Sequence, residues 1–188
     1  MRVVLASKSP RRRELLGKIV PDFEIITRET DETLPSGIHP REGVEILAVR
    51  KGEAVVGDVG NDALIISSDT LVELGGVPLG KPGSEDDALE ILMELSGMTH
   101  NVHTGVAVHY RGRVFSGVDT SSVTFRKINE AEAREYIATG EPMDKAGAYA
   151  IQGIGAKFVE KYEGEFDTIV GLGLKLTKKL IDEALKDE

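Results

Sequence analysis

Apolar and polar positions in the first half of the chain follow two kinds of spacing. Short apolar runs bounded by turn residues predict strands, and apolar residues repeated every three or four positions after a capping Ser or Pro predict helices. The expected strands are Val3–Ala6, Phe23–Thr27 and Ala63–Ser67. The expected helices are Pro10–Ile19, Pro40–Val56 and Ser84–Leu95. This order of strands and helices is typical of an α/β fold.

The second half of the chain opens with a different pattern. From Thr99 to Phe125 the sequence alternates around a turn at Tyr110–Gly112, which predicts a long two-stranded ribbon that extends the sheet or carries a second lobe. The remaining expected elements are a helix at Glu130–Ala138, a strand at Lys157–Tyr162 and a helix at Thr177–Leu185. The longest linkers are expected at Glu29–His39 and Glu141–Ala156.

The composition is that of an ordinary globular domain. A chain of 188 residues can bury one substantial core, so we expect a single domain over residues 1–188 with room for a smaller lobe. Hydrophobic residues make up 40% of the chain, but no apolar run is long enough to cross a bilayer, which argues against a membrane protein. The first apolar run is too short for a signal peptide, so we expect a cytoplasmic location.

The absence of Cys agrees with that compartment and excludes thiol nucleophiles and thiolate zinc sites. Catalysis must therefore come from oxygen and nitrogen groups. The chain has 23 basic and 32 acidic residues, a net charge of −9, which disfavours binding to a nucleic-acid backbone. A small anionic substrate remains compatible with this charge if a few cationic side chains and a divalent cation gather in one place.

Three patterns resemble functional motifs but fail on spacing or context. Gly75–Lys81 has the spacing of a phosphate-binding loop, but Pro82 stands where the motif needs a hydroxyl for magnesium. Gly153–Gly155 lacks the third glycine of a dinucleotide-binding fingerprint. His100 and His103 are three apart in an expected strand and should point to opposite faces, which favours structural or surface roles over joint metal binding.

Ser67–Thr70 follows the apolar run of the third expected strand. The carboxyl ends of strands in open α/β sheets face the ligand crevice, which makes Asp69 a candidate catalytic or metal-binding carboxylate. A cap or turn role explains the same position equally well. The residues alone leave both roles open.

Ser7–Arg12 joins the first expected strand to the N-terminus of a helix. Unpaired backbone N–H groups and the helix dipole favour an anion at such a junction, and Arg11 and Arg12 add positive charge. Taken alone, the segment is more simply explained as a helix capped by Ser9 with exposed arginines.

The segment Thr139–Gly153 places an acid, the Asp144–Lys145 pair and Gln152 among small residues that offer little side-chain packing. Polar side chains on a segment of this kind are typical of a ligand-binding loop.

Together these segments resemble the signature of the Maf family of nucleoside triphosphate pyrophosphatases. The matching stretches are SKSPRRRELL at Ser7–Leu16, SSDTLVELGGVPLGKP at Ser67–Pro82 and TGEPMDKAGAYAIQG at Thr139–Gly153. The resemblance runs from Leu5 to about Leu180. It implies an α/β fold of the Maf and ITPase type, with a central mixed sheet flanked by helices and two lobes around a cleft.

The resemblance also implies roles for individual residues, with Asp69 matching the family's proposed proton acceptor. The implied catalytic residues are Asp69, Lys81 and Lys145. The implied substrate-binding residues are Ser7, Ser9, Arg11, Arg12, Lys51, Thr70, Asp144 and Gln152. Glu32 and Asp69 are the implied ligands of a divalent cation, Mg²⁺ or Mn²⁺, which carboxylates hold together with phosphate oxygens.

Three positions match the pyrimidine type within the family, which acts on dTTP and UTP. They are Arg12, Thr70 and Gln152. A Gln amide donates and accepts hydrogen bonds at once, which suits the imide edge of uracil or thymine. The chain departs from the common pattern at Ala150, where Gly is usual, and at Gly173, where Pro is usual.

The expected activity is hydrolysis of dTTP or UTP, and of modified pyrimidine nucleotides, to the monophosphate and pyrophosphate. The alternative is a nucleotide-binding regulator of septum formation that does not hydrolyse its ligand. Asp69 discriminates between the two, because only the enzyme needs a carboxylate that activates water. The expected partner is a nucleoside triphosphate, and no binding to nucleic acid or to membranes is expected. We also expect a homodimer, although no sequence feature supports it.

Overall fold

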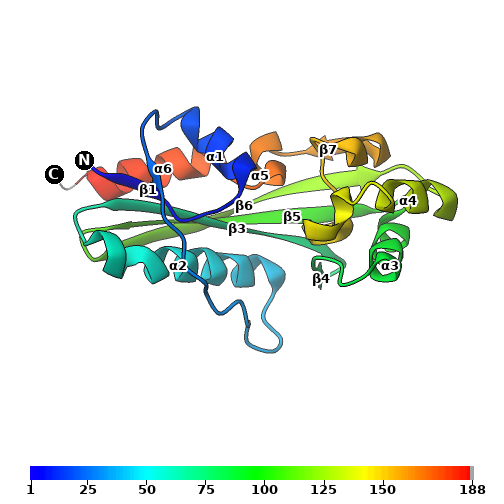
Figure 1. The fold of residues 1–188 in the computed structure, drawn as a ribbon, viewed down its shortest axis with the longest axis horizontal. Coiled ribbons are helices and arrows are strands. Elements are labelled where there is room, and N and C mark those ends of the chain that lie inside the picture. Colours follow the sequence, from blue (N-terminus) through cyan, green and yellow to red (C-terminus); the bar gives the residue numbers. More distant parts are fainter. Residues whose placement is uncertain (187–188) are drawn as a thin grey trace. The chain divides into compact units, whose positions relative to one another are not determined.

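The computed structural model describes residues 1–186 and contains a seven-stranded sheet with helices (Figure 1). The strands are β1 (Val3–Leu5), β2 (Glu24–Ile25), β3 (Leu64–Leu74), β4 (Val77–Leu79), β5 (Thr99–Tyr110), β6 (Arg113–Phe125) and β7 (Val159–Glu163). The α-helices are α1 (Pro10–Gly17), α2 (Pro40–Val59), α3 (Glu85–Leu95), α4 (Glu130–Ile137), α5 (Phe166–Val170) and α6 (Leu174–Leu185). Short 3₁₀ helices are η1 (Glu141–Asp144), η2 (Ala146–Ala148) and η3 (Ile154–Phe158).

The sheet is mixed and has the strand order β2-β1-β3-β5-β6-β7, with β4 paired to β3. β1 runs parallel to both β2 and β3, whereas β4 is antiparallel to β3 and β7 is antiparallel to β6. This arrangement confirms the predicted α/β fold with a central mixed sheet.

The chain divides into two compact units, and each is built from separate stretches of sequence. Unit 1 comprises Met1–Thr70, Thr104–Asp119 and the segment from Gly171 onward. Unit 2 comprises Leu71–His103 and Thr120–Val170. The predictions of a single domain and of two lobes around a cleft stay predictions.

In unit 1, small residues let α2 pack close to the sheet. A Cβ atom at Gly105 in β5 would lie 2.5 Å from the Val44 carbonyl oxygen of α2. A Cβ atom at Gly52 in α2 would lie 2.7 Å from the Ser67 hydroxyl of β3. That hydroxyl donates a hydrogen bond of 2.7 Å to the Ala48 carbonyl. The two glycines therefore set how closely the helix approaches β3 and β5.

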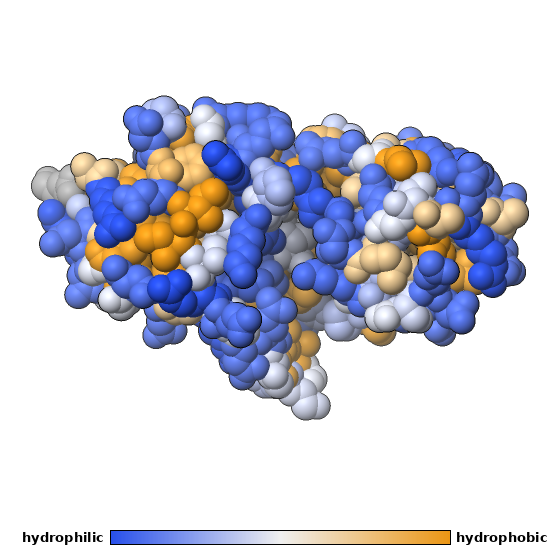
Figure 2. All heavy atoms as spheres, viewed as in Figure 1, coloured by the Kyte–Doolittle hydropathy of each residue, from blue (hydrophilic) through white to orange (hydrophobic). Residues whose placement is uncertain are grey.

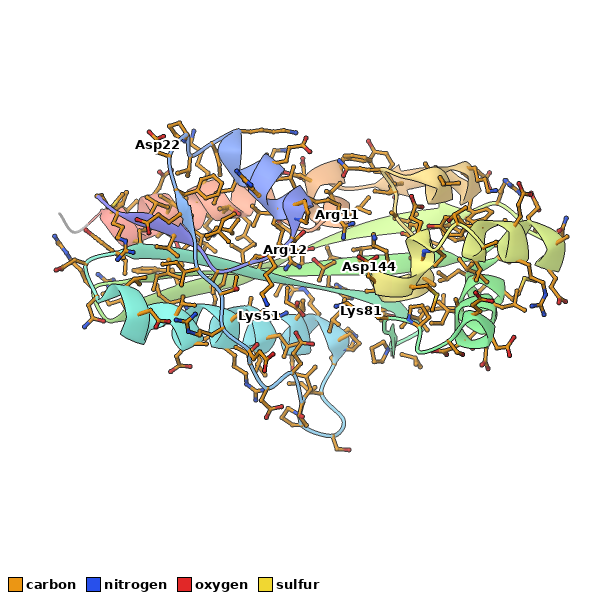
Figure 3. The ribbon with its side chains drawn as sticks, in the orientation of Figure 1. Arg11, Arg12, Asp22, Lys51, Lys81 and Asp144 are labelled. Atoms are coloured by element: carbon orange, nitrogen blue, oxygen red, sulfur yellow. The ribbon has the colours of Figure 1, made fainter. Side chains whose placement is uncertain are left out.

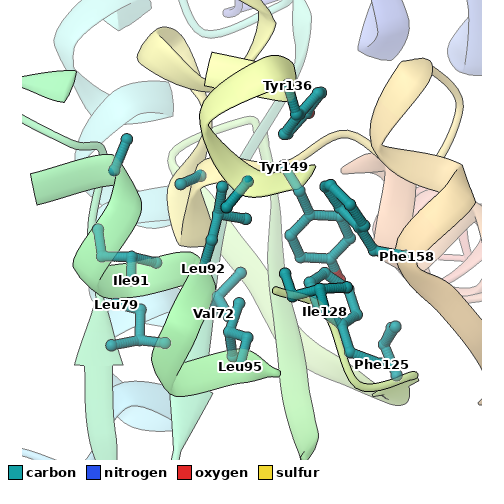
Figure 4. Close-up of a cluster of buried hydrophobic side chains, with 14 of the residues drawn as sticks. Val72, Leu79, Ile91, Leu92, Leu95, Phe125, Ile128, Tyr136, Tyr149 and Phe158 are labelled. Carbon is teal, nitrogen blue, oxygen red and sulfur yellow. The ribbon is translucent and has the colours of Figure 1, made fainter. Parts of the chain in front are cut away.

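Unit 2 has its own apolar core, shown in Figure 4. Its centre is aromatic: Phe125 and Tyr149 stack edge to face with ring centroids 4.7 Å apart, and Tyr136 meets Phe158 in the same way at 5.2 Å. The aliphatic side chains of this core include Val72, Leu79, Ile91, Leu92, Leu95 and Ile128. Full burial of each large apolar side chain contributes about 1.5–3 kcal/mol.

Several boundaries differ from the sequence expectations. β3 continues to Leu74 instead of ending at Ser67, and α2 continues to Val59. The sequence analysis missed β4 and α5, and the expected linker at 141–156 contains 3₁₀ helices. Such short elements lack a sustained apolar period, so the pattern of the chain does not indicate them.

Charged and polar residues cover much of the face shown in Figure 2. Among residues 1–186, no helix combines the length and the apolar character needed to span a membrane.

Candidate functional site

Asp69, Lys51 and Glu32 form one cluster in unit 1. The Lys51 ammonium lies 2.5 Å from Asp69 Oδ1 and 2.8 Å from Glu32 Oε1, so the two carboxylates share one cation. The side chains of Asp69 and Lys51 are 13% and 20% exposed, and that of Glu32 is 60% exposed. Three residues far apart in the sequence thus meet at one point.

The close packing of α2 places Lys51 in this cluster. Lys51 is labelled beside α2 in Figure 3. Lys51 directly precedes Gly52, where the missing side chain leaves room for the ring of His109 and the hydroxyl of Ser67. His109 is itself fixed by a contact of 3.1 Å between its Nε2 and the Val49 carbonyl oxygen. A bulkier residue at Gly52 would push α2, and Lys51 with it, away from β3.

Asp69 lies in the middle of β3, so the prediction that Ser67–Thr70 follows the end of a strand is wrong. The neighbouring strand ends there instead, because the last register pair between β1 and β3 joins Leu5 to Ile66. The apolar residues Leu64, Ile65 and Ile66 pair with β1, and the polar residues Ser67–Thr70 follow directly after them in β3.

The loop that carries Glu32 is held by Arg50, the residue directly before Lys51 in α2. The Arg50 guanidinium donates hydrogen bonds to the Thr33 carbonyl at 2.7 Å and the Asp31 carbonyl at 3.1 Å. Within the loop, the Thr33 N–H donates to Asp31 Oδ1 at 2.8 Å. Sequence reasoning did not single out Arg50, because its partners are backbone carbonyls of a distant loop.

Arg12 and Thr70, two of the three positions that match the pyrimidine type, are in direct contact. Arg12 Nη2 donates to Thr70 Oγ1 at 3.2 Å, and Arg12 Nε donates to the Gly171 carbonyl at 2.8 Å. The Ser68 hydroxyl donates to the same Gly171 carbonyl at 2.9 Å. Gly171 therefore fixes the guanidinium, a role that the sequence analysis missed.

The N-terminus of α1 completes the group in unit 1. Ser9 is the helix cap, as predicted, and accepts a hydrogen bond from the Arg12 N–H at 3.4 Å. The Ser7 hydroxyl accepts a hydrogen bond from Arg12 Nη1 at 3.4 Å. Arg11, the residue before Arg12, is half-buried. Burial lowers the pKa of Arg12 and the negative charges of Asp69 and Glu32 oppose that shift. The guanidinium stays protonated at neutral pH.

The remaining predicted site residues lie in unit 2. A hydrogen bond of 3.1 Å from the Gly147 N–H to the Gly80 carbonyl joins the loop before Lys81 to η2, the 3₁₀ helix after Lys145. The Lys145 ammonium pairs with Asp144, and the side chain of Lys81 is exposed. The structure thus brings the two predicted catalytic lysines onto adjoining segments.

Comparison with known proteins decides the family. The family model described as "Maf-like protein" matches residues 2–184. The chain belongs to this family. A dTTP/UTP pyrophosphatase from Pelotomaculum thermopropionicum is 46% identical over 92% of this chain and 91% of its own. Another protein of that name, from Thermococcus kodakarensis, is 44% identical over 95% of this chain and 94% of its own.

A solved structure, that of the Ham1 protein of Staphylococcus aureus, resembles this Maf-like chain in fold. It has a TM-score of 0.51 and 17% sequence identity, covering 100% of this chain and 97% of that chain. At this identity the likeness concerns the fold alone, and it agrees with the predicted fold type.

The Maf-like chain contains a further polar group that sequence reasoning did not assign. The Glu141 carboxylate accepts hydrogen bonds from the Tyr136 hydroxyl at 2.6 Å and from the N–H groups of Ile154 and Gly155 at 3.0 Å each. These partners frame the turn that carries the exposed side chain of Gln152. The composition of the segment pointed to a ligand loop, but not to the residue that holds it.

The rejected motifs have structural explanations in the Maf-like fold. Gly75 and Gly76, both with positive φ, form the turn between β3 and β4, and the next helix, α3, starts only at Glu85. His100 and His103 are each 2% exposed, so their roles are structural and not at the surface. Within residues 1–186, no three His, Asp or Glu side chains gather in a way that could hold a metal ion.

Proposed function

We propose that this Maf-like chain hydrolyses dTTP and UTP to the nucleoside monophosphate and pyrophosphate. The observation that carries the proposal is the cluster in which Lys51 binds both Asp69 and Glu32. The names of the relatives support it, since proteins over 40% identical across nearly the whole chain are dTTP/UTP pyrophosphatases. The non-hydrolysing regulator has no comparable support.

Asp69 is the proposed general base that takes a proton from the attacking water. Its ion pair with Lys51 fixes the carboxylate on β3, which is the orientation that proton transfer requires. Water then attacks the α-phosphorus in line with the leaving pyrophosphate, so no covalent intermediate forms. Lys81 and Lys145 are the proposed cations that bind the departing phosphates, and Arg11, Ser7 and Ser9 are proposed substrate contacts.

Glu32 and Asp69 fit a divalent cation, Mg²⁺ or Mn²⁺. They are hard oxygen donors that already converge on one positive centre, the Lys51 ammonium. Mg²⁺ is usually bound by one or two carboxylates with water and substrate phosphates, so a third acidic ligand is not needed. When bound, such a cation would supply Lewis-acid polarisation of the phosphate.

Gln152 is the proposed reader of the pyrimidine, with the linked Arg12 and Thr70 as further specificity residues. An amide that pairs with the imide edge leaves unpaired groups when another base enters, which disfavours ATP and GTP. Gln152→Ala is expected to reduce the preference for UTP more than it reduces kcat for UTP.

The test is release of pyrophosphate from dTTP, UTP, CTP, ATP and GTP in the presence of Mg²⁺ or Mn²⁺. We expect kcat/KM to be highest for dTTP and UTP. Hydrolysis in H₂¹⁸O should place the label in the monophosphate, because water attacks the α-phosphorus. Label in pyrophosphate, release of inorganic phosphate alone, or purine nucleotides hydrolysed at least as fast would each contradict the proposal.

The cytoplasmic location, the absence of nucleic-acid binding and the homodimer stay predictions. Analytical ultracentrifugation at micromolar concentration would decide the last of these.

A further inference from the structure

The loop of residues 150–155, here called the Gln152 loop, is held at both ends by one pair of side chains in unit 2. At its C-terminal end, the two oxygens of Glu141 accept from the N–H groups of Ile154 and Gly155, at 3.0 Å each. At its N-terminal end, the Tyr136 hydroxyl accepts from the Ala150 N–H at 3.3 Å. Gln152 lies between these anchors.

The pair acts as one unit because its members bind each other. The Tyr136 hydroxyl donates to Glu141 Oε2 at 2.6 Å, so one hydroxyl group joins the Ala150 anchor to the Glu141 anchor. The ring of Tyr136 is fully buried and packs against Phe158 with centroids 5.2 Å apart. The hydroxyl is thereby fixed to the unit 2 core.

Glycine is required where the loop meets the pair. A Cβ atom at Gly155 would lie 2.7 Å from the Tyr136 hydroxyl oxygen, and a Cβ atom at Gly153 would collide with the Glu141 carboxylate. The sequence around Gln152, IQGIG, therefore allows the backbone to reach the carboxylate. Without these glycines the anchors could not form.

The charge state of the pair suits this role at neutral pH. Burial raises the pKa of Glu141, but the hydrogen bonds from Tyr136, Gly155 and Ile154 and the charge of Lys145 hold it below its usual value. Burial and the bond to Glu141 raise the pKa of Tyr136, so its hydroxyl keeps the proton that it donates. An ionised carboxylate gives stronger hydrogen bonds to backbone N–H groups than a neutral acceptor.

We propose that Glu141 and Tyr136 are positioning residues that fix the backbone of the Gln152 loop and so determine how strictly the enzyme selects its nucleobase. The inference rests on the proposed function, in which Gln152 reads the base. Neither residue needs to touch the nucleotide, because both act through the loop. A carboxamide on an unanchored loop would lose the fixed geometry on which discrimination by hydrogen bonds depends.

Two variants test the proposal, each with a matched control. Tyr136→Phe removes the hydroxyl and keeps the buried ring, and Tyr162→Phe changes a tyrosine that is 45% exposed. Glu141→Gln replaces one acceptor oxygen by a donor, and Glu135→Gln changes an exposed glutamate of α4. We expect both test variants to lower the ratio of kcat/KM for UTP to that for ATP by roughly ten-fold, the effect of losing a charge-assisted hydrogen bond. The controls should keep the wild-type ratio.

A double-mutant cycle with Gln152→Ala separates positioning from general support of the fold. If the pair acts through Gln152, adding Tyr136→Phe to Gln152→Ala should change the UTP/ATP ratio little further. An additive loss, or an unchanged ratio in folded single variants, would overturn the proposal. Failure of wild-type enzyme to release pyrophosphate from UTP would instead refute the proposed function.

Amide hydrogen exchange provides a measurement that needs no variant. In wild-type protein without nucleotide, the amide protons of Ile154 and Gly155 should exchange far more slowly than that of the exposed Gln152. Exchange of all three at the rate of an unstructured loop would show that the anchors do not hold, and would overturn the proposal even if neither variant folds.

Discussion

At the scale of single residues, the chemistry of the Asp69 side chain can be changed while its shape is kept. Asn has nearly the same shape but cannot accept the proton of the attacking water. Asp69→Asn should therefore lower kcat by about 10²–10⁴-fold and leave the fold intact. Pyrophosphate release and thermal unfolding would measure the two effects, with Asp62→Asn, an exposed aspartate, as the control. A variant that kept more than about a tenth of the wild-type rate would contradict the role of Asp69.

Lys81 and Lys145, on adjoining segments of unit 2, permit a second comparison. Lys81→Ala and Lys145→Ala should each lower kcat/KM by about 10–100-fold, because each removes a charge-assisted hydrogen bond to a phosphate. Lys8→Ala is the control, since Lys8 is an exposed cation that is not among the implied catalytic or substrate-binding residues. Equal losses in all three variants would mean that these charges act only through the general electrostatic field.

At the residue scale, the sequence indicated some residues of the candidate site and missed others. Asp69, Lys51 and Glu32 were assigned by family resemblance, and the structure places them within ion-pair distance. Glu141 was missed because two of its partners are backbone N–H groups more than ten positions away, at separations of 13 and 14 residues. Backbone donors carry no signature in a sequence.

At the scale of elements, two of the three glycines in α2, Gly52 and Gly57, have opposite surroundings. A Cβ atom at Gly57 would have no heavy atom within 4 Å, whereas a Cβ atom at Gly52 would overlap His109 and Ser67. Gly57→Ala should stabilise the protein by about 0.5–1 kcal/mol, since Ala has the higher helix propensity. Gly52→Ala should instead destabilise it by about 1–3 kcal/mol through overpacking.

Urea unfolding of the two variants would measure these changes, and pyrophosphate release would add a functional readout. Gly52→Ala should also lower activity, because a displaced α2 withdraws Lys51 from Asp69, and Gly57→Ala should not. A stabilising effect of Gly52→Ala would contradict the packing described for α2.

The sequence predicted the long helices and the strands of the ribbon because their periodicity persists over many residues. It carries a residue of low helix propensity at Gly52, where the sheet approaches α2 closely. The predicted third strand also ended too early, at Ser67. β3 continues through the polar residues Ser67–Thr70, where its pairing with β1 has already ended. Tertiary contacts decided both positions.

At the scale of the whole molecule, buried histidines should make stability depend on pH. Burial lowers the pKa of His100 from 6.5 to about 4, and its Nδ1 atom has no hydrogen-bond partner among the described residues. Between these two pH values the unfolded chain binds a proton that the native protein does not. The free energy of unfolding should therefore fall with decreasing pH, by about 3 kcal/mol from pH 6.5 to 4 for this residue.

Burial also lowers the pKa of His109, although the hydrogen bond to Val49 and the charge of Glu53 oppose it, so His109 contributes with the same sign. Urea unfolding at pH 7, 6, 5 and 4 would measure the total effect. His100→Gln should be less stable at pH 7 and should show a shallower dependence on pH. An unchanged slope in that variant would exclude His100 as a source of the effect.

The interleaving of the two units affects how the protein is made and how it can change over time. Unit 1 needs the first 70 residues, the stretch Thr104–Asp119 and the segment after Gly171, so it cannot be completed until that last segment has left the ribosome. Nascent chains should expose unfinished sheet for most of translation, which favours dependence on chaperones. A single crossover between relatives within residues 71–170 would divide both units, so recombination points inside that stretch should be disfavoured.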